Sequence, residues 1–270
     1  MKNHLLISDL DGTLLDGKQK ISMENKTSIK QFIKNGGLFT IATGRIEESV
    51  YPYMQELGIA LPVILYNGAV IYDYQKKQRI FEQKITQFTP LFNQLQTFSE
   101  GHSIGINYYQ NKRAYTLDYN ELVKENEKKD KVKVKQISAD FDTSYVTKVL
   151  VISNDPANLK KCEQLVQSSG VSCDMVYSDK IYLEILPKDA SKGNAMKELL
   201  KYIEQTNLHI TCVGDHENDL AMLQIADTAY VVENAIDLLK QQNFRETVHH
   251  EHHAIQRIIG DIGHSVALKG

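Results

Sequence analysis

The chain has 270 residues, of which 42% are hydrophobic and 24% are charged, as in an average soluble globular protein. This composition excludes a disordered or fibrous chain, and the length allows one large domain or two smaller ones. The net charge of −3 argues against a broad nucleic-acid-binding face. No apolar run approaches the roughly 18 residues of a membrane span, and three separated cysteines without CxxC spacing indicate reduced thiols. We therefore expect a cytoplasmic protein without nucleic-acid or membrane partners, and no obligate protein partner is evident.

Residues 1–82 alternate short apolar runs with amphipathic segments. Strands are predicted at Leu5–Ser8, Leu38–Ala42 and Pro62–Leu65, and the first helix between them has Ser22 as its N-cap. This strand–helix rhythm predicts a parallel sheet with helices on its faces. The same rhythm returns after Ser191, where a helix precedes a strand over 209–213.

Residues 83–187 have a different pattern. Strands are predicted at Ile104–Tyr109, Ala114–Tyr119, Val146–Ser153 and Ile181–Leu186, with helices near 89–99 and 156–168. This pattern indicates an α+β module of about 100 residues, inserted into a core made of 1–82 and 188–270. Between Glu121 and Lys135, ten of fifteen residues are charged with mixed sign, so we interpret this stretch as a solvated helix and turn rather than a partner site.

Two aspartates follow the first predicted strand directly. Asp9 and Asp11 flank Leu10, and residues two apart in an extended segment point to the same side, so both carboxylates can reach one site. In open α/β sheets, ligands bind at the carboxyl ends of the strands, where this pair lies. Two like charges repel unless a cation or a proton lies between them, and ligands that are all oxygen indicate Mg²⁺. Taken alone, the pair is better explained by a turn or a helix N-cap.

Three further polar motifs lie at strand ends or helix starts. Thr43-Gly44-Arg45 follows a strand and opens a helix that should end near Gly58, and its hydroxyl and N–H groups suit an anion. Lys192 lies at the start of another predicted helix and offers a compact positive charge. Asp215 and Asp219, in Gly214-Asp215-His216-Glu217-Asn218-Asp219, are one helical turn apart. Together with the first pair, these motifs favour a functional site over a simple turn.

At this point the sequence resembles the haloacid dehalogenase superfamily of aspartate-nucleophile phosphotransferases. The run Asp9-Leu10-Asp11-Gly12-Thr13-Leu14-Leu15 matches the first motif of that superfamily. Within it, Tyr66-Asn67-Gly68-Ala69 and the motif of Asp215, Asn218, Asp219 and Met222 are similar to the Cof-type, sugar-phosphatase-like branch. The resemblance implies a Rossmann-like core (1–82 and 188–270) with an α+β cap (83–187) inserted between the second and third motifs.

The resemblance also implies a role for each matching residue. Asp9 would attack phosphorus and form an aspartyl-phosphate, and Asp11 would protonate the leaving alcohol and then activate water. Mg²⁺ would be held by the Asp9 carboxylate, the Asp11 backbone carbonyl and the Asp215 carboxylate, with Asp219 behind them orienting Lys192 or a water. The phosphoryl oxygens would be bound by the Leu10 and Gly44 N–H groups and by Thr43, Lys192 and Asn218.

Two residues beside the motifs have two interpretations each. Arg45 could contact phosphate or substrate, or it could be a solvated or salt-bridged helix residue. Asn67 could contact phosphate or substrate, or it could be a turn residue, since Asn-Gly tolerates positive φ.

Two segments depart from the family pattern. Val232-Glu233-Asn234-Ala235 keeps only Asn-Ala of a Met-Gly-Asn-Ala run, and His249–His253 replaces an acidic-Gly-Val element. We interpret the histidine segment as a solvated helix entry, with a metal site as the alternative. Four tyrosines of the inserted module are interpreted as cap core rather than as a sugar-stacking platform: Tyr108, Tyr109, Tyr115 and Tyr119.

The predicted function is Mg²⁺-dependent hydrolysis of a small phosphorylated metabolite, a sugar or cofactor phosphate, under a cap that closes over Asp9. A phosphomutase, which returns phosphate to its substrate, and a non-catalytic phospho-ligand sensor are the alternatives. Residues 83–187 contain no recognisable binding motif, so the sequence does not identify the substrate.

Overall fold

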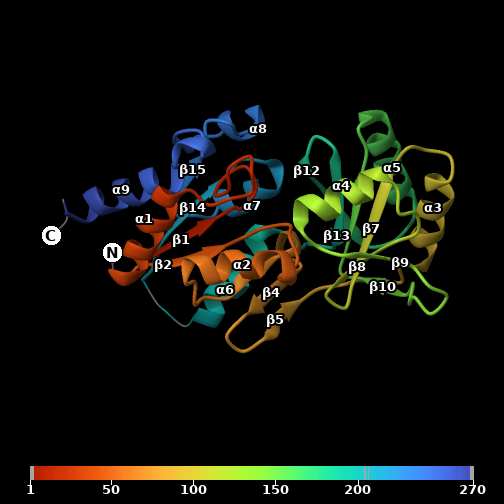
Figure 1. Ribbon diagram of the computed structural model, residues 1–270, viewed down its shortest axis with the longest axis horizontal. Coiled ribbons are helices and arrows are strands. Elements are labelled where there is room, and N and C mark those ends of the chain that lie inside the picture. Colours follow the sequence, from red (N-terminus) through yellow and green to blue (C-terminus); the bar gives the residue numbers. More distant parts are fainter. Residues whose placement is uncertain (1–2, 204, 206, 268–270) are drawn as a thin grey trace.

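The computed structural model describes residues 3–203, 205 and 207–267, so the first two and last three residues of the predicted core lie outside it. The chain forms two lobes (Figure 1). One lobe combines the N-terminal elements with the C-terminal ones, and the other is made by the middle of the chain. Within the described residues, no helix is long and apolar enough to cross a membrane.

A parallel sheet forms the centre of the first lobe. Its strands, in spatial order, are β16 (Arg245–Glu246), β15 (Thr228–Val231), β14 (His209–Gly214), β1 (His4–Ser8) and β2 (Leu38–Ile41). Every neighbouring pair is parallel, as the strand–helix rhythm predicted. Because β1 and β14 are adjacent and parallel, the residues that follow them meet at one edge of the sheet.

Helices lie between these strands along the chain, and one more follows the last strand. They are α1 (Met23–Lys34), α2 (Glu47–Leu57), α6 (Lys192–Ile203), α7 (Leu220–Leu223), α8 (Asp237–Lys240) and α9 (Ala254–Ala267). Short 3-10 turns lie at 217–219 and 250–252. Ser22 caps α1, because its side chain accepts a hydrogen bond from the Asn25 N–H. Helix α2 ends at Gly58, whose left-handed conformation supplies the predicted stop.

Two predictions for the first lobe need correction. The segment Thr43–Ile46 is a loop, since Arg45 N–H donates to Thr43 Oγ1 and the extended Ile46 precedes the first helical residue. Strand β3 (Val63–Leu65) is not a full member of the parallel sheet, which it meets at a single bridge from Ile64. Positive φ angles at 66–68 turn the chain back there, so β3 forms an antiparallel hairpin with β4 (Val70–Asp73) and β5 (Gln78–Glu82).

The second lobe contains a six-stranded sheet. Its strands are, in spatial order, β12 (Cys173–Asp179), β13 (Tyr182–Pro187), β11 (Lys148–Ile152), β7 (Gly105–Gln110), β8 (Arg113–Thr116) and β9 (Val134–Gln136). Strand β10 (Tyr145–Val146) pairs instead with β6 (Ile85–Thr86). The strand predicted over 114–119 is therefore shorter, and the one over 146–153 is interrupted at Thr147.

The two faces of this sheet have different partners. Helices α3 (Thr89–Ser99) and α5 (Pro156–Ser168) pack on one face over Tyr108, Val149 and Leu183. Side chains alternate along a strand, so Tyr109 and Leu150 project from the opposite face, where they join the core of the first lobe. Tyr108 is thus cap core, as expected, and Tyr115 packs against that core. Tyr109 is buried at the junction with the first lobe instead, and the core interpretation is wrong for Tyr119, which is 39% exposed. Helix α4 (Glu121–Asp130) lies beside β7.

Candidate active site

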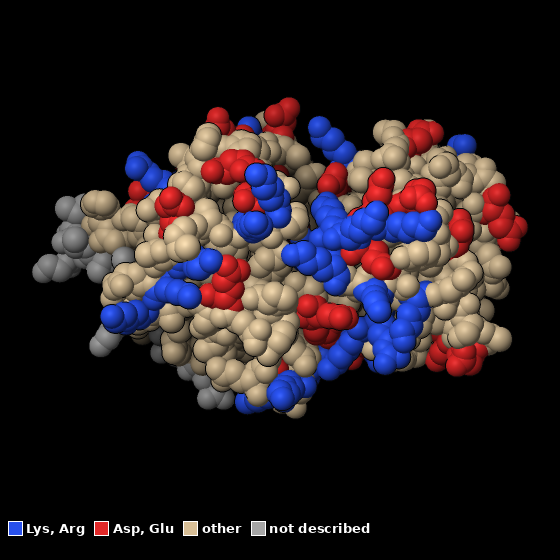
Figure 2. Space-filling model, in the orientation of Figure 1, with Lys and Arg blue, Asp and Glu red and all other residues tan. Residues whose placement is uncertain are grey.

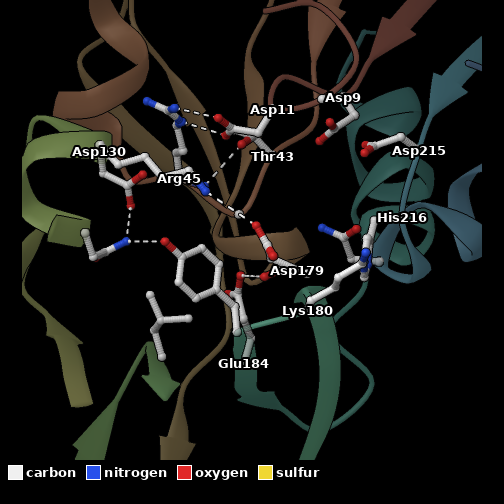
Figure 3. Close-up of a pocket in the computed structure, with 18 of the residues that line it drawn as sticks. Asp9, Asp11, Thr43, Arg45, Asp130, Asp179, Lys180, Glu184, Asp215 and His216 are labelled. Carbon is white, nitrogen blue, oxygen red and sulfur yellow. Dashed lines mark hydrogen bonds and ion pairs between the residues drawn. The ribbon is translucent and has the colours of Figure 1, made fainter. Parts of the chain in front are cut away.

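A cavity of about 320 Å³ lies at the junction of the two lobes. Seven residues predicted from the sequence line it: Asp9, Asp11, Thr43, Gly44, Arg45, Asp215 and Asn218. They come from three separate stretches of the first lobe, at the carboxyl ends of β1, β2 and β14. Strands β11, β12 and β13 and helix α4 of the second lobe close the cavity from the other side (Figure 3).

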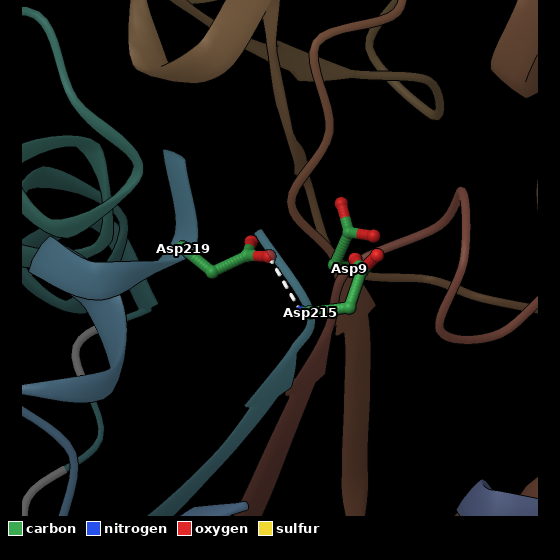
Figure 4. A group of neighbouring side chains, drawn as sticks. All are labelled: Asp9, Asp215 and Asp219. Atoms are coloured by element: carbon green, nitrogen blue, oxygen red, sulfur yellow. Dashed lines mark hydrogen bonds between the residues drawn. The ribbon is translucent and has the colours of Figure 1, made fainter. Parts of the chain in front are cut away.

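Three carboxylates gather where the core meets this cavity. Asp9 and Asp215 line it, whereas Asp219 is fully buried next to them. Each of Asp9, Asp215 and Asp219 offers an oxygen within 4.8 Å of the others (Figure 4). Gly12, with φ +78°, brings the loop after β1 against this group, and a Cβ on it would lie 2.4 Å from Asp215 Oδ2. Only glycine suits such a conformation and such a close approach.

Lys192 connects the carboxylates of Asp9 and Asp219. Its Nζ lies 2.6 Å from Asp9 Oδ1 and 2.6 Å from Asp219 Oδ1, and its side chain is fully buried. Although burial opposes the charge, the two carboxylates hold the pKa of Lys192 above its ordinary value. The other oxygen of Asp219 accepts hydrogen bonds from the N–H groups of Asp215 and His216. Asp219 therefore orients Lys192 and the loop that carries Asp215.

Burial makes the negative charge of this group costly. It raises the pKa of Asp9 to about 7, with Lys192 opposing the shift and Asp219 adding to it. Burial, followed by the charge of Asp9, also raises the pKa of Asp215. Carboxylates this close need a cation or a proton between them. Their oxygens are the ligands that Mg²⁺ prefers, so the donor set fits that ion.

This electrostatic balance predicts that Mg²⁺ stabilises the protein more at pH 8 than at pH 5.5. The folded-state pKa of Asp9 is raised to about 7, so Asp9 is mostly protonated at the lower pH, and a proton must leave before a cation binds. A ligand present at 100 times its Kd stabilises by about 2.7 kcal/mol. Thermal unfolding with and without 10 mM Mg²⁺ at both pH values measures the difference.

The variant Asp215→Asn is the matched control for that measurement, because it removes one ligand and leaves Lys192 in place. It should lose most of the Mg²⁺ response at pH 8. An equal shift at both pH values, or an unchanged shift in the variant, would contradict the assignment.

Arg45 binds the second aspartate. Its Nε and its Nη2 lie 2.7 and 2.6 Å from the two carboxylate oxygens of Asp11, and Gln19 and Ser49 complete its contacts (Figure 3). Burial alone would raise the pKa of Asp11, but the bonds and charge of Arg45 hold it below its ordinary value. The salt-bridged interpretation of Arg45 is thus the one that the structure supports. The contact with Arg45 therefore favours the ionised form of Asp11.

Three of the predicted anion-binding residues, Thr43, Gly44 and Asn218, also line the cavity, whereas Leu10 and Lys192 are buried next to it. Thr43 is buried and accepts the Arg45 N–H, which leaves its own hydroxyl proton for another acceptor. Leu10 is fully buried, and its carbonyl anchors the turn by accepting from residues 14 and 15. Asn218 Nδ2 donates to Asn67 Oδ1 over 3.0 Å.

Asn67 is both a turn residue and a neighbour of the site. Its φ of +53° confirms the turn interpretation, and its side chain is almost completely buried. Its Nδ2 lies beside Gly44 and has no hydrogen-bond partner among the residues that the structure describes. A buried N–H group without a partner is costly, and a phosphoryl oxygen would satisfy it.

Sequence reasoning did not find the residues of the second lobe that face the cavity. These are Asn126, Lys129, Asp130, Lys148, Leu150, Ser178, Asp179, Lys180, Tyr182 and Glu184. The interpretation of Glu121–Lys135 as a purely solvated stretch is wrong for the last turn of α4, where Lys129 and Asp130 line the cavity. The outer face of α4 and its neighbours does carry exposed basic side chains (Figure 2). His216, whose Nδ1 lies 2.9 Å from the Tyr177 carbonyl, was also missed.

The histidine segment supports the loop that follows Asp11. His250 Nδ1 lies 2.7 Å from the Leu15 carbonyl, and Glu251 accepts the Gly17 N–H. The segment forms a half-exposed turn that leads into α9, as expected of a helix entry. The histidine segment, although it departs from the family pattern, thus has a structural use. Asn234, which the pattern keeps, donates to the Gly12 carbonyl of the same loop.

A parallel sheet whose strand ends present three carboxylates, a buried lysine and anion-binding groups under a second lobe defines a hydrolase of the capped α/β class. A family model for haloacid dehalogenase-like hydrolases matches residues 6–259, and the chain belongs to this family. The resemblance seen in the motifs is thereby confirmed.

Several known proteins are similar to this chain. A 5-amino-6-(5-phospho-D-ribitylamino)uracil phosphatase of Bacillus subtilis is 30% identical over 87% of this chain and 89% of its own length. A pyridoxal phosphate phosphatase of Escherichia coli is 24% identical over 89% and 91%. A solved structure of a subclass IIB sugar phosphatase superposes with a TM-score of 0.82 at 18% identity, covering 96% and 99% of the two chains. The fold is that of hydrolases with a core and a cap.

Proposed function

We propose that the protein is a Mg²⁺-dependent phosphatase that hydrolyses small phosphate monoesters through an aspartyl-phosphate on Asp9. The observation that carries the proposal is the contact of the buried Lys192 with both Asp9 and Asp219. Asp9 in turn lines the cavity together with Asp11 and Asp215. This group combines a nucleophile, a cation site and a fixed positive charge, which are the parts that phosphoryl transfer needs.

Two steps follow from the placement of Asp9 and Asp11. A carboxylate oxygen of Asp9 forms a bond to phosphorus while the bond from phosphorus to the alcohol oxygen breaks, and Asp11 gives the alcohol a proton. Water then attacks the phosphorus of the aspartyl-phosphate and Asp11 takes its proton. The bond from phosphorus to the Asp9 oxygen breaks, which releases inorganic phosphate and restores the Asp9 carboxylate. Mg²⁺ bound by Asp9, Asp215 and the Asp11 carbonyl would neutralise charge on the phosphoryl oxygens.

Asp11 needs a proton for the first of these steps, whereas Arg45 favours its ionised form. We infer that entry of the anionic substrate draws Arg45 toward the phosphoryl group and weakens its hold on Asp11. Thr43, Asn218, Lys192 and the N–H groups of Leu10 and Gly44 would bind the phosphoryl oxygens.

The polar wall of the cavity supports a small, hydrophilic alcohol as the leaving group. Leu150 and Ile236 are the aliphatic side chains that line it, and charged or amide groups make up much of the rest. The two named relatives act on different substrates, a ribitylaminouracil phosphate and pyridoxal phosphate, as their names state. We therefore propose a sugar or cofactor phosphate as the class of substrate. For the protein itself, we propose a core of residues 1–82 and 188–270, a cap of residues 83–187 and a location in the cytoplasm.

Turnover of p-nitrophenyl phosphate with Mg²⁺ and with EDTA tests the proposal. We expect hydrolysis that disappears with EDTA and returns when Mg²⁺ is added in excess, because the buried carboxylates repel phosphate unless a cation neutralises them. A panel of sugar and nucleotide phosphates follows the same protocol. Activity that is unchanged in EDTA would overturn the metal assignment. Absence of turnover on the whole panel would favour the mutase or the sensor.

A further inference from the structure

Lys148 lies on the cap and reaches across the junction to the core loop 43–46, which carries Thr43 and Gly44 and is called the phosphate-binding loop below. Its Nζ lies 2.7 Å from the Gly44 carbonyl oxygen and 2.7 Å from Glu184 Oε2. Its side chain is only 4% exposed, and its ammonium lies 4.7 Å from the centre of the Tyr109 ring. A buried lysine that leaves its own lobe to contact a backbone carbonyl needs an explanation other than solubility.

The cap sheet holds Lys148 in place for this contact. Lys148 on β11 is paired in register with Tyr109 on β7, and Glu184 lies on β13, the other neighbour of β11. Glu184 is itself fixed, because the Ser178 hydroxyl donates to its Oε1 over 2.6 Å. The ammonium is therefore positioned by three adjacent strands of one sheet, as a rigid extension of the cap.

The peptide group that Lys148 contacts is part of the proposed phosphate site. The Gly44 carbonyl and the Arg45 N–H belong to one peptide, and that N–H donates to Thr43 Oγ1 over 3.2 Å. Fixing the carbonyl fixes the plane of the peptide, and a charge on the oxygen strengthens donation by the nitrogen. Thr43 then has its acceptor position filled and its hydroxyl proton directed elsewhere, toward the cavity that it lines.

Gly44 permits this approach of the cap. A Cβ at position 44 would lie 3.0 Å from Glu184 Oε1 and 3.1 Å from both side-chain polar atoms of Asn67. The absence of a side chain thus lets Glu184, and with it Lys148, come up to the loop. The close fit is a second observation, independent of the hydrogen bond, that links this ion pair to the loop.

We infer that Lys148 is a positioning residue of the phosphatase reaction, which completes the phosphate-binding loop only when the cap lies against the core. The inference rests on the proposed function and deepens it. Because the ammonium comes from the cap and the loop from the core, opening the cap removes the charge from the Gly44 carbonyl. Cap closure and formation of the anion site are thereby coupled through one contact.

The variant Lys148→Met tests this inference, together with the double variant Lys148→Met/Glu184→Gln. The single change leaves the Glu184 carboxylate buried beside the loop without its cation, and the double change removes that complication. A matched control is Lys160→Met, which breaks an exposed Lys160–Glu163 pair on helix α5 of the cap, outside the cavity.

Binding of inorganic phosphate in the presence of Mg²⁺, measured by calorimetry, is the first readout. Phosphate has no leaving group, so only the anion site itself can change its affinity. We expect both Lys148 variants to bind phosphate about 10- to 100-fold more weakly, because a displaced binding group typically causes a loss of this size. The kcat/KM for p-nitrophenyl phosphate should fall to a similar extent. Lys160→Met should match the wild type. Unchanged phosphate affinity with a raised substrate KM would overturn the inference, because Lys148 would then contact the leaving group.

Hydrogen exchange at the Arg45 amide is the second readout, and it does not depend on turnover. Loss of Lys148 should accelerate exchange at this amide, while amides of the central sheet keep their protection. Equal exchange at Arg45 in all variants would also overturn the inference. If the wild type hydrolyses no phosphate ester, the proposed function fails, but the exchange result still decides whether Lys148 orders the loop.

Discussion

Replacing Asp9 by Asn should reduce turnover of phosphate monoesters by more than about 10³-fold, the scale on which loss of a nucleophile acts. An amide oxygen cannot form the acyl-phosphate bond that the reaction requires. The replacement is otherwise nearly isosteric, and Lys192 keeps its contact with Asp219. Steady-state kinetics at pH 7.5 with 10 mM Mg²⁺ measures the loss, and acid-quenched enzyme should carry no covalent phosphate.

The same variant should be at least as stable as the wild type without metal at pH 8. Burial raises the pKa of Asp9 from 3.8 to about 7, so the folded state loses stability as the pH rises through the range between these two values, and at pH 8 the cost of the charge is fully present. A neutral side chain removes that cost, and it also removes much of the stabilisation by Mg²⁺. Loss of activity together with a large loss of metal-free stability would mean that the variant is misfolded. Turnover that survives the replacement would exclude Asp9 as the nucleophile.

The site in the core was predictable because the geometry of a parallel sheet brings together residues that are far apart in the sequence. Asp9 and Asp215 are more than two hundred positions apart, yet each follows an apolar run that could only be a buried strand. Parallel neighbouring strands end at the same edge, so placing both runs in one sheet already placed both carboxylates together. Lys192 was identified by its place at a helix start and by the family pattern. Its burial between two carboxylates came from the structure.

The cap half of the cavity could not be predicted in the same way. Lys148 and Glu184 are single charges within apolar strands, and a lone charged residue there is compatible with either face of a sheet. Which face meets the core depends on how the cap is placed, a long-range property that no local pattern contains. The alternation of side chains along β11 is the signal that could have identified them. Lys148 and Leu150 lie on one face of the sheet, whereas Val149 and Val151 lie on the other.

The misreading of α4 has a related cause. Its composition is that of a solvated helix, and most of its residues are at least partly exposed. The second half of the helix reaches the junction, where Asn126 and Lys129 line the cavity and the Ser49 hydroxyl donates to the Asp130 carbonyl over 2.5 Å. Burial raises the pKa of Asp130, while the nearby Arg45 opposes the shift. A run of charged residues therefore predicts that a helix is exposed on average, but it does not predict which turns of that helix contact another lobe.

Replacing Lys192 by Met should both abolish activity and destabilise the protein, unlike the loss at Asp9. The ammonium is fully buried and lies 2.6 Å from each of two carboxylates, which would lose their common partner. Breaking a buried ion pair from one side costs about 3–5 kcal/mol, and loss of an electrostatic donor at the reaction centre costs on the order of 10²–10³-fold in kcat. Urea unfolding and steady-state kinetics measure the two effects.

The loss of stability should depend on pH in a direction that identifies its cause. Carboxylates left without a cation in a buried site take up protons readily, so at pH 5.5 the charge that destabilises Lys192→Met is partly neutralised. The variant should therefore be closer to the wild type at pH 5.5 than at pH 8, and Mg²⁺ should restore part of the difference at pH 8. Lys201→Met, at an exposed position of the same helix, supplies the control for losing a lysine from α6. A destabilisation that is equal at both pH values would show that Lys192 acts through packing, and the electrostatic account of the site would then be wrong.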